Sequence, residues 1–277
     1  MDKSSLAGVL LAVGGILAGL LLEGGNLGQI LQPTAAMIVL GGTIGAVMLQ
    51  FPLFTVVTAF KRLVEVFWAP ANDPREVITR LVQYAQQARK EGIVSLDKEV
   101  QTLTEPFMKK SLMLAVDGTE PQELRHMMEL ELDNQAEHEE HIPQVFESAG
   151  GFAPTIGIIG AVLGLIQVMK NLANIEEVGR GIAVAFVATV YGVGLANIFL
   201  LPAANKIKTR IRDDTQRKEL MLEGVAGIVE GLNPMLIRSK LDAYTGPAIP
   251  EKTTEPSAGR AVNKPVVTEA RAATVRT

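Results

Sequence analysis

Four long apolar segments alternate with polar ones along this chain of 277 residues. Two of them, about 5–22 and 33–50, lie near the N-terminus, and the other two, about 152–169 and 181–201, form a pair in the second half. Each is close to the roughly 20 residues that a helix needs to cross a bilayer. The first could be the apolar part of a signal peptide, but it is long and no Ala-x-Ala cleavage site follows it. The pattern therefore predicts four transmembrane helices.

The polar segments between the spans carry helical rather than strand-like periodicity. In the insertion between the second and third spans, apolar positions recur at helical spacing, and no alternating strand pattern extends beyond a few residues. The fourth span is followed by a basic and then amphipathic segment, and the end of the chain is rich in Pro, Thr, Ala and Lys, which predicts disorder. We therefore predict an all-α polytopic membrane protein with a helical cytoplasmic domain. Its five predicted parts are the first two spans (1–50), the cytoplasmic domain (51–149), a pore-lining hairpin (150–202), a C-terminal helix (203–243) and a disordered tail (244–277).

Helix boundaries inside the insertion can be predicted from local signals. Residues 51–68 have the pattern of an amphipathic helix. Gly92 is expected to end a second helix, and Ser95 is expected to open the next one. Pro121 follows at the start of a helix that runs through the acidic residues 129–147.

The distribution of basic residues orients the spans. The two short loops, 23–32 and 171–179, contain no Lys or Arg, whereas the insertion contains ten and the segment after Pro202 contains thirteen. Cytoplasmic loops are the ones enriched in Lys and Arg. The insertion and both termini are therefore expected in the cytoplasm.

Composition excludes several classes of function. The chain has no cysteine, so disulfides and thiolate metal sites are impossible, and a net charge of −4 gives no footprint for nucleic acid. His126, His138 and His141 lie in one acidic segment, where a solvated helix face competes with a weak metal-like spacing. No nucleophile–base pair or phosphate loop is present, so we expect no enzyme, no cofactor and no metal.

The four spans contain no Asp, Glu, Arg or His. An ion-driven machine needs a titratable group at membrane depth, so a partner would have to supply it. The spans do offer the hydroxyls of Thr155, Thr189 and Tyr191, and Pro154 interrupts the backbone. Alternatively, the threonines hydrogen-bond within their own helices and Pro154 marks a helix start.

Small residues recur three and four apart in the last two spans. This spacing places them on one face of each helix, where helix backbones can approach closely in lipid. They are Gly157, Gly160 and Gly164 in the first helix, and Gly181, Ala185, Ala188, Gly192 and Ala196 in the second.

This hairpin resembles the MotA/PomA family of flagellar stator subunits. The resemblance is carried by Phe152–Thr155 (FAPT), Gly157–Gly164 (GIIGAVLG), Gly181–Gly192 (GIAVAFVATVYG), Ala196-Asn197 and Pro202, and it spans nearly the whole chain. It implies an ion channel of the bacterial cytoplasmic (inner) membrane that converts ion flow into torque. Five copies are expected around a dimer of a MotB-like single-span subunit, which brings an essential Asp and a peptidoglycan-binding domain.

The resemblance also implies which residues act. Ala161 stands where sodium-type members carry a Thr, which favours H⁺ over Na⁺, because sodium must exchange its hydration oxygens for protein oxygens. The residues expected in the ion pathway and partner-helix contact are Pro154, Thr155, Gly157, Ala161, Thr189, Tyr191 and Pro202.

A charged segment of the insertion resembles the part of the family that meets the rotor protein FliG. Arg89 matches the basic residue of that segment, followed by Lys90, and Asp97 replaces the usual Glu, with Glu99 as a possible substitute. The alternative is a solvated surface, because exposed charge pairs are individually weak. Two other functions compete with a stator: a TolQ/ExbB-type proton-channel subunit that energises an outer-membrane system, and a membrane scaffold that conducts nothing.

Overall fold

The computed structural model describes residues 3–68 and 74–245, and this part of the chain contains helices and turns but no strand. In chain order the elements are α1 (Lys3–Leu22), α2 (Leu27–Ile30), α3 (Pro33–Gln50), α4 (Leu53–Trp68), α5 (Pro74–Glu91), η1 (Ile93–Leu96), α6 (Asp97–Thr102), α7 (Pro106–Val116), α8 (Pro121–Lys170), α9 (Ile175–Gly194), η2 (Leu195–Leu200), α10 (Leu201–Val229), α11 (Pro234–Asp242) and η3 (Ala243–Thr245). The prediction of an all-α fold is confirmed.

Within the described residues, four helical stretches are long and apolar enough to cross a membrane, as predicted. Two of them extend far beyond the apolar segment itself. The third span is the second half of the 50-residue helix α8, and the fourth belongs to a continuous helical stretch, Ile175–Val229. The predicted boundaries at 149/150 and 202/203 therefore fall inside helices rather than in linkers.

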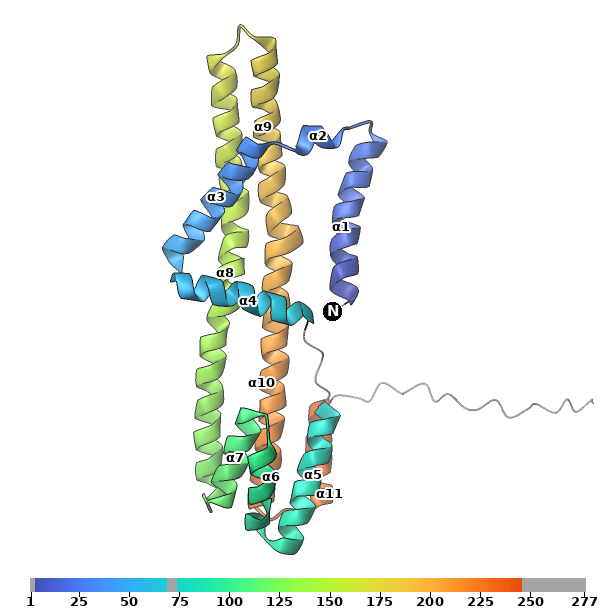
Figure 1. Cartoon of the computed structure of the whole chain (residues 1–277), viewed down its shortest axis with the longest axis vertical. Helices are drawn as coiled ribbons and strands as arrows, with labels where there is room; N and C mark the ends of the chain where they lie inside the picture. Colours follow the sequence, from blue (N-terminus) through green and yellow to red (C-terminus); the bar gives the residue numbers. More distant parts are fainter. Residues whose placement is uncertain (1–2, 69–73, 246–277) are drawn as a thin grey trace, which may run out of the picture. The chain divides into compact units, whose positions relative to one another are not determined.

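α8 lies side by side with the stretch formed by α9, η2 and α10 (Figure 1). α3 packs against both α8 and α9, and its Ala35, Val39 and Val47 are buried there. α1 contacts η2, but no residue of its apolar window is buried within the chain. The hairpin of α8 and α9 therefore forms the centre of the membrane part, with α3 on one side of it.

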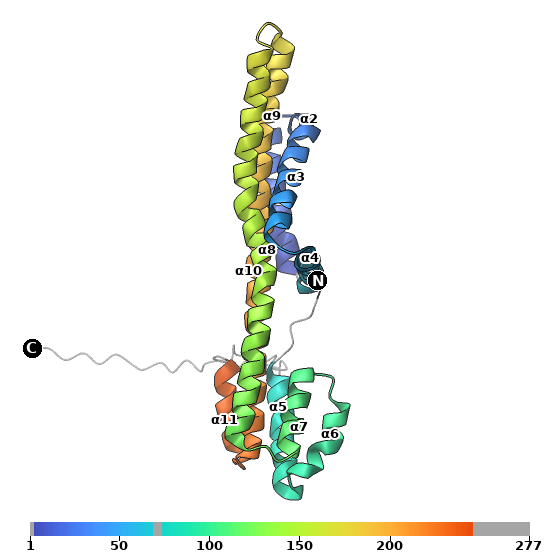
Figure 2. The same cartoon turned by 90° about the vertical axis from the view of Figure 1, so that its left-hand side faces the viewer.

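α4 turns sharply away from α3 and crosses α8 and α10 (Figure 1), so that Figure 2 shows it nearly end-on. The turn follows from Pro52, because a residue before proline avoids the helical conformation, and Phe51 is extended at φ −121° and ψ 143°. Ala59 of α4 is buried against Phe146 and Ile207. α4 thus fixes the ends of the membrane helices to one another.

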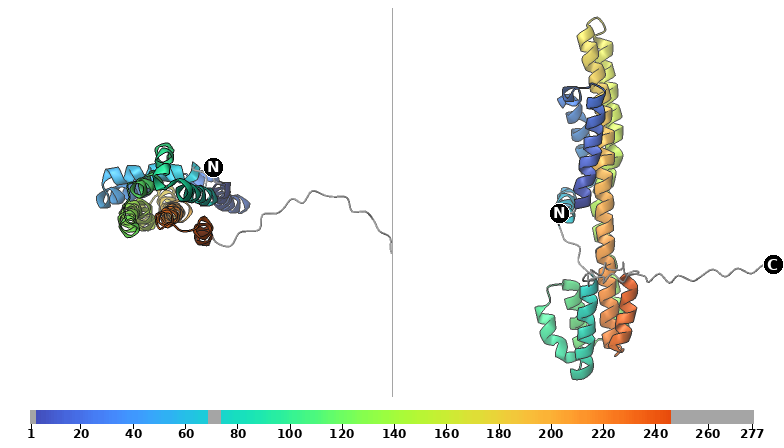
Figure 3. Two further views of the ribbon diagram at one scale, coloured as in Figure 1. Left: turned by 90° about the horizontal axis from the view of Figure 1, so that it is seen from below. Right: turned by 90° about the vertical axis from the view of Figure 1, so that its right-hand side faces the viewer.

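The domain that the sequence places in the cytoplasm, called the cytoplasmic domain below, forms around the far ends of α8 and α10. α5, α7 and α11 pack against α10, and α6 lies against α7 (Figure 3). The core consists of large aliphatic and aromatic side chains, among which Leu81, Leu112 and Leu124 have no exposed surface. This domain has the usual organisation of a helical protein in water.

Three details of the predicted cytoplasmic helices were wrong. Ser95 does not cap a helix, because its hydroxyl donates to the carbonyl of Gly92 and α6 begins at Asp97. The single helix over 203–243 is divided, because Gly231 adopts φ +72° and Asn233 caps α11. The predicted tail begins too early, since Tyr244 packs against the core; its remainder, 246–277, lies outside the described residues.

Candidate functional site

The two hairpin helices touch through their backbones. A Cβ atom on Gly157 would lie 2.8 Å from the carbonyl oxygen of Ala188, and one on Gly164 would lie 2.7 Å from the carbonyl oxygen of Gly181. Both distances are too short for a real contact. The stripe of small residues predicted on each helix is therefore the surface on which α8 and α9 meet.

Gly157 does not offer open space to a partner helix. The sequence interpretation placed Gly157 in the contact with the partner helix. In the structure Gly157 is buried against Ala188 and Gly192 of the same chain. The reason is geometric, since a stripe of glycines shows that a helix packs there but not which helix.

The side of the hairpin away from α3 remains free. α3 reaches α8 at Ile156 and Gly160, and it packs against Val187 and Ala188 of α9. Helical spacing of 100° per residue places Pro154 and Ala161 on the opposite side of α8, and Thr189 on the matching side of α9. These three are half-buried and lie among exposed apolar residues, which are Ile158, Leu165, Ile182, Phe186 and Val193. We call this set of residues the free face.

The hydroxyls of the two threonines bond to their own helices, as the alternative interpretation expected. Thr189 donates to the carbonyl of Ala185 at 3.3 Å, and Thr155 donates to that of Phe152 at 2.8 Å. Thr155 is exposed and, by helical spacing, lies on the side of α8 that faces away from α9, not on the free face. Thr189 thus supplies the hydroxyl of the free face, and its oxygen can still accept.

Tyr191 lies on the α3 side of the hairpin. Its hydroxyl donates to the carbonyl of Ile30 at 2.6 Å and accepts from the N–H of Gln32 at 3.4 Å. The role of Tyr191 in the ion pathway stays a prediction, and in this structure its polar atom is engaged by the segment that leads into α3. Its partners lie about 160 residues away in sequence, and no local pattern indicates them.

Pro154 does not start a helix but lies inside α8, which rules out that part of the alternative interpretation. A proline in a helix leaves the carbonyl four residues earlier, here that of Gly150, without its usual partner. Leu200 and Leu201 pack over Gly150. The backbone of α8 is therefore irregular at Gly150, where it meets Leu200 and Leu201.

On the neighbouring helix, residues Leu195–Leu200 form a π-helix directly before Pro202. The N–H of Leu201 donates to the carbonyl of Ala196, five residues earlier. A wider turn accommodates the missing N–H of Pro202, and such turns are frequent at functional sites. The backbone irregularities next to the two prolines, at Gly150 and at Leu195–Leu200, thus lie against each other.

The predicted rotor segment is exposed at the end of α5. Arg89 and Lys90 occupy its last turn, and in the described part of the chain neither forms an ion pair. Asp97 is exposed at the start of α6 and accepts from the side chain of Gln101. Glu99 is half-buried beside Tyr84, so Asp97 is the more accessible carboxylate.

An ion-pair network ties the cytoplasmic domain together. Arg125 of α8 binds Glu223 of α10 at 2.6 Å, and Lys240 of α11 binds the same carboxylate at 2.9 Å. The hydrogen bond from Arg125 and the one from Lys240 outweigh partial burial and lower the pKa of Glu223 to about 2. The network joins three helices, so it has a structural role.

The three histidines lie exposed on α8. His141 is 3.3 Å from the side-chain oxygen of Gln144. Within residues 3–68 and 74–245, no group of three or more metal-binding side chains comes together.

Known proteins resemble this chain over most of its length. The profile of the MotA/TolQ/ExbB proton channel family matches residues 99–220, and that of the motility protein A N-terminal segment matches residues 6–92. Motility protein A of Bacillus subtilis strain 168 is 34% identical over 249 residues, which are 88% of this chain and 91% of the relative. The chain belongs to the MotA family of flagellar stator subunits.

Two solved structures agree with this family. MotAB of C. jejuni superposes with a TM-score of 0.84 and 32% identity, and the flagellar MotAB stator complex from Bacillus subtilis superposes with 0.81 and 33%. In both cases the match covers 88% of this chain and 96% of the other. The chain is thus a multi-pass membrane protein of the stator type, and the N-terminal match includes the two spans that distinguish it from the TolQ/ExbB type.

Sequence reasoning about this stator subunit missed Pro143. This residue lies buried inside α8, eleven positions before Pro154. Eleven residues are three turns, so the two prolines lie on nearly the same side of the helix. The helix predicted through residues 129–147 already contained Pro143, but the prediction did not single this residue out.

Proposed function

We propose that this chain, in the bacterial inner membrane and together with a MotB-like single-span partner, forms a proton channel that drives the flagellar rotor. The observation that carries the proposal is the free face of the hairpin. It presents apolar side chains, Pro154 within α8 and the hydroxyl of Thr189, but no titratable group. A partner helix that brings a carboxylate would complete a proton path there.

The chemistry of the free face favours H⁺ over Na⁺. A dehydrated sodium ion needs several oxygen ligands at once. Ala161 contributes none, and Thr189 contributes one oxygen that already donates its proton to Ala185. Protonation of a carboxylate requires only access for water, so the transported ion is H⁺ in this proposal.

Exposed apolar surface supports an assembly of several copies. Residues of α8 on the lipid or neighbour side are exposed, such as Ile159 at 56% and Met169 at 68%, and α1 is hardly packed within its own chain. Five copies around a dimer of the partner would cover much of this surface. The insertion and both termini then lie in the cytoplasm, in agreement with the distribution of Lys and Arg.

Torque is transmitted through the exposed charged segment at the end of α5. Arg89, Lys90 and Asp97 are accessible and without ion pairs to one another in the described residues, so they are available to FliG. Charge complementarity of this kind fixes register and encounter rate more than affinity.

Swimming of a stator-deleted host that expresses this chain and its partner tests the proposal. Swimming should persist in sodium-free buffer and stop with a protonophore. Arg89→Glu combined with Asp97→Lys should reduce swimming speed while proton conduction continues, and opposite reversals on FliG should restore it. Rotation that stops on withdrawal of sodium at a constant proton gradient would overturn the assignment of the ion.

A further inference from the structure

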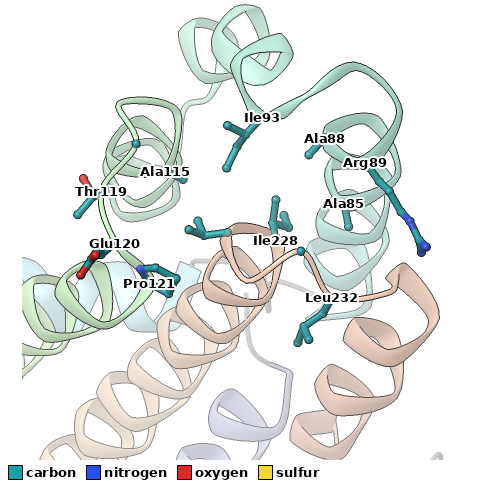
Figure 4. A pocket seen from close by; sticks show the side chains of 13 residues that line it. Ala85, Ala88, Arg89, Ile93, Ala115, Thr119, Glu120, Pro121, Ile228 and Leu232 are labelled. Carbon is teal, nitrogen blue, oxygen red and sulfur yellow. The ribbon is translucent and has the colours of Figure 1, made fainter.

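The cytoplasmic domain contains a cavity of about 360 Å³ that the rotor segment borders but the function above does not use. It lies between α5, the turn from α7 to α8 and the turn from α10 to α11 (Figure 4). Apolar side chains form most of its walls. Among them are those of Ala85, Ala88, Ile93, Ile228 and Leu232.

Charged groups lie only at the edge of this cavity. Arg89 lines it with its aliphatic part, and its guanidinium extends outward along α5 in Figure 4. The carboxylate of Glu120, on the opposite edge, also points away from the interior. Lys90 follows Arg89 in the same exposed turn. The edge formed by α5 is therefore basic, whereas the interior has no charge.

Two residues that lie close in sequence to lining residues are large, apolar and exposed. Val94 follows Ile93 and is 68% exposed, and Met235, the second residue of α11 and three residues after Leu232, is 72% exposed. Large apolar side chains that lie exposed around an apolar cavity are typical of a protein-binding surface.

We propose that this cavity is a socket for one large apolar side chain of the rotor protein, with an acidic residue close to that side chain paired to Arg89. This inference rests on the rotor contact proposed above. A cavity near the lower end of the range for ligand pockets, about 300–1,000 Å³, and without polar groups in its interior, offers little to a polar small molecule. It does fit an anchor residue, and buried anchors carry most of the energy of protein interfaces.

The socket explains how a weak electrostatic contact can hold the rotor protein in one defined position. Exposed charge pairs contribute little and act over several ångströms. A side chain that enters the cavity fixes the position of its own segment, which places the acidic residue of that segment beside Arg89. The charges then guide the approach, and the socket defines where it ends.

Filling the cavity tests the proposal directly. Ala88→Leu adds a branched side chain to the wall, and Gln83→Leu adds the same side chain to the exposed, opposite side of α5. With the full stator complex in nanodiscs, Ala88→Leu should weaken binding of the rotor protein by at least about tenfold, and Gln83→Leu by less than about twofold. The thermal midpoint of the Ala88→Leu complex should not fall, because the change fills space.

A second measurement avoids any effect on folding. The chain has no cysteine, so a single one can be labelled after assembly with a cysteine-free partner. In the Thr119→Cys complex, reaction with N-ethylmaleimide should abolish rotor binding, whereas the unlabelled complex binds normally. Gln83→Cys is the matched control and should bind equally well before and after labelling.

The outcomes separate the socket from the rotor contact. If Arg89→Glu weakens rotor binding but labelled Thr119→Cys and Ala88→Leu bind as tightly as the parent, the socket is wrong and the rotor contact stands. If the parent complex neither binds the rotor protein nor supports swimming, the proposed function itself fails. If Ala88→Leu removes an association between stator complexes instead, the occupant is a second copy and the proposal is overturned.

Discussion

The two halves of α8 are packed by opposite means. In the cytoplasmic half, Leu124, Met128 and Leu132 are buried among other large side chains. In the membrane half, Gly157 and Gly164 bring the backbone of α8 against that of α9. One continuous helix is therefore packed through large side chains in one half and through close backbone contact in the other.

The solvent accounts for this difference. In water, burial of an aliphatic side chain contributes about 1.5–3 kcal/mol, so large residues stabilise the cytoplasmic domain. In lipid, a leucine gains nothing by leaving the solvent, and close van der Waals contact between small residues holds helices together. The same residue type thus has opposite value in the two halves, which can be tested by substitution.

The largest effect is expected where a side chain is added in the membrane half. Gly164→Leu would place its Cβ 2.7 Å from the carbonyl oxygen of Gly181, so α8 and α9 must separate. We expect no stator complex in size-exclusion chromatography and no swimming, although the chain still inserts. Gly45→Leu, at a glycine of α3 with no atom near its Cβ position, is the control and should assemble normally.

The next effect is expected where a side chain is removed in the cytoplasmic half. Leu124→Ala deletes a side chain with no exposed surface and should cost about 2–5 kcal/mol of unfolding free energy. Thermal unfolding of the purified complex measures this loss. An unchanged midpoint would show that the cytoplasmic domain does not depend on its aliphatic core.

Much of this contrast could be predicted from the sequence, because both solvents leave a pattern. The length of the apolar runs indicated the spans, and α3 has the predicted bounds because Pro33 and Pro52 frame it. The continuity of α8 from the acidic segment into the membrane span could not be predicted, since a proline such as Pro154 would end most helices. The helix that packs against Gly157 could not be predicted either, because the spacing of small residues indicates a packed face but not which helix packs there.

The cytoplasmic half should also respond to pH, unlike the membrane half. The pKa of Glu223 is lowered from 4.5 to about 2, so its ion pairs stabilise the folded domain above about pH 4.5. This contribution, at most about 3 kcal/mol, is lost as the pH falls from about 4.5 towards 2. The thermal midpoint should therefore fall over this range in the parent, and it should fall less in Glu223→Gln. Equal slopes for the two proteins would contradict a role for this network.

The smallest effect is expected for a hydrogen bond in the membrane half. Tyr191→Phe removes the bond to the carbonyl of Ile30 and the one from the N–H of Gln32. Hydrogen bonds between membrane helices contribute about 0.6 kcal/mol each, so the complex should lose about 1 kcal/mol of stability. The ring remains and continues to pack against α3.

The same variant decides between two roles for Tyr191. If its hydroxyl only holds the segment before α3, proton flux into proteoliposomes with the reconstituted complex should be unchanged, while the thermal midpoint falls slightly. Thr189→Ala, on the free face, should do the reverse, because it removes the hydroxyl beside the proposed path and leaves the α3 contact intact. A loss of proton flux in Tyr191→Phe at normal stability would show that Tyr191 belongs to the ion pathway. The partner helix would then face the α3 side of the hairpin and not the free face.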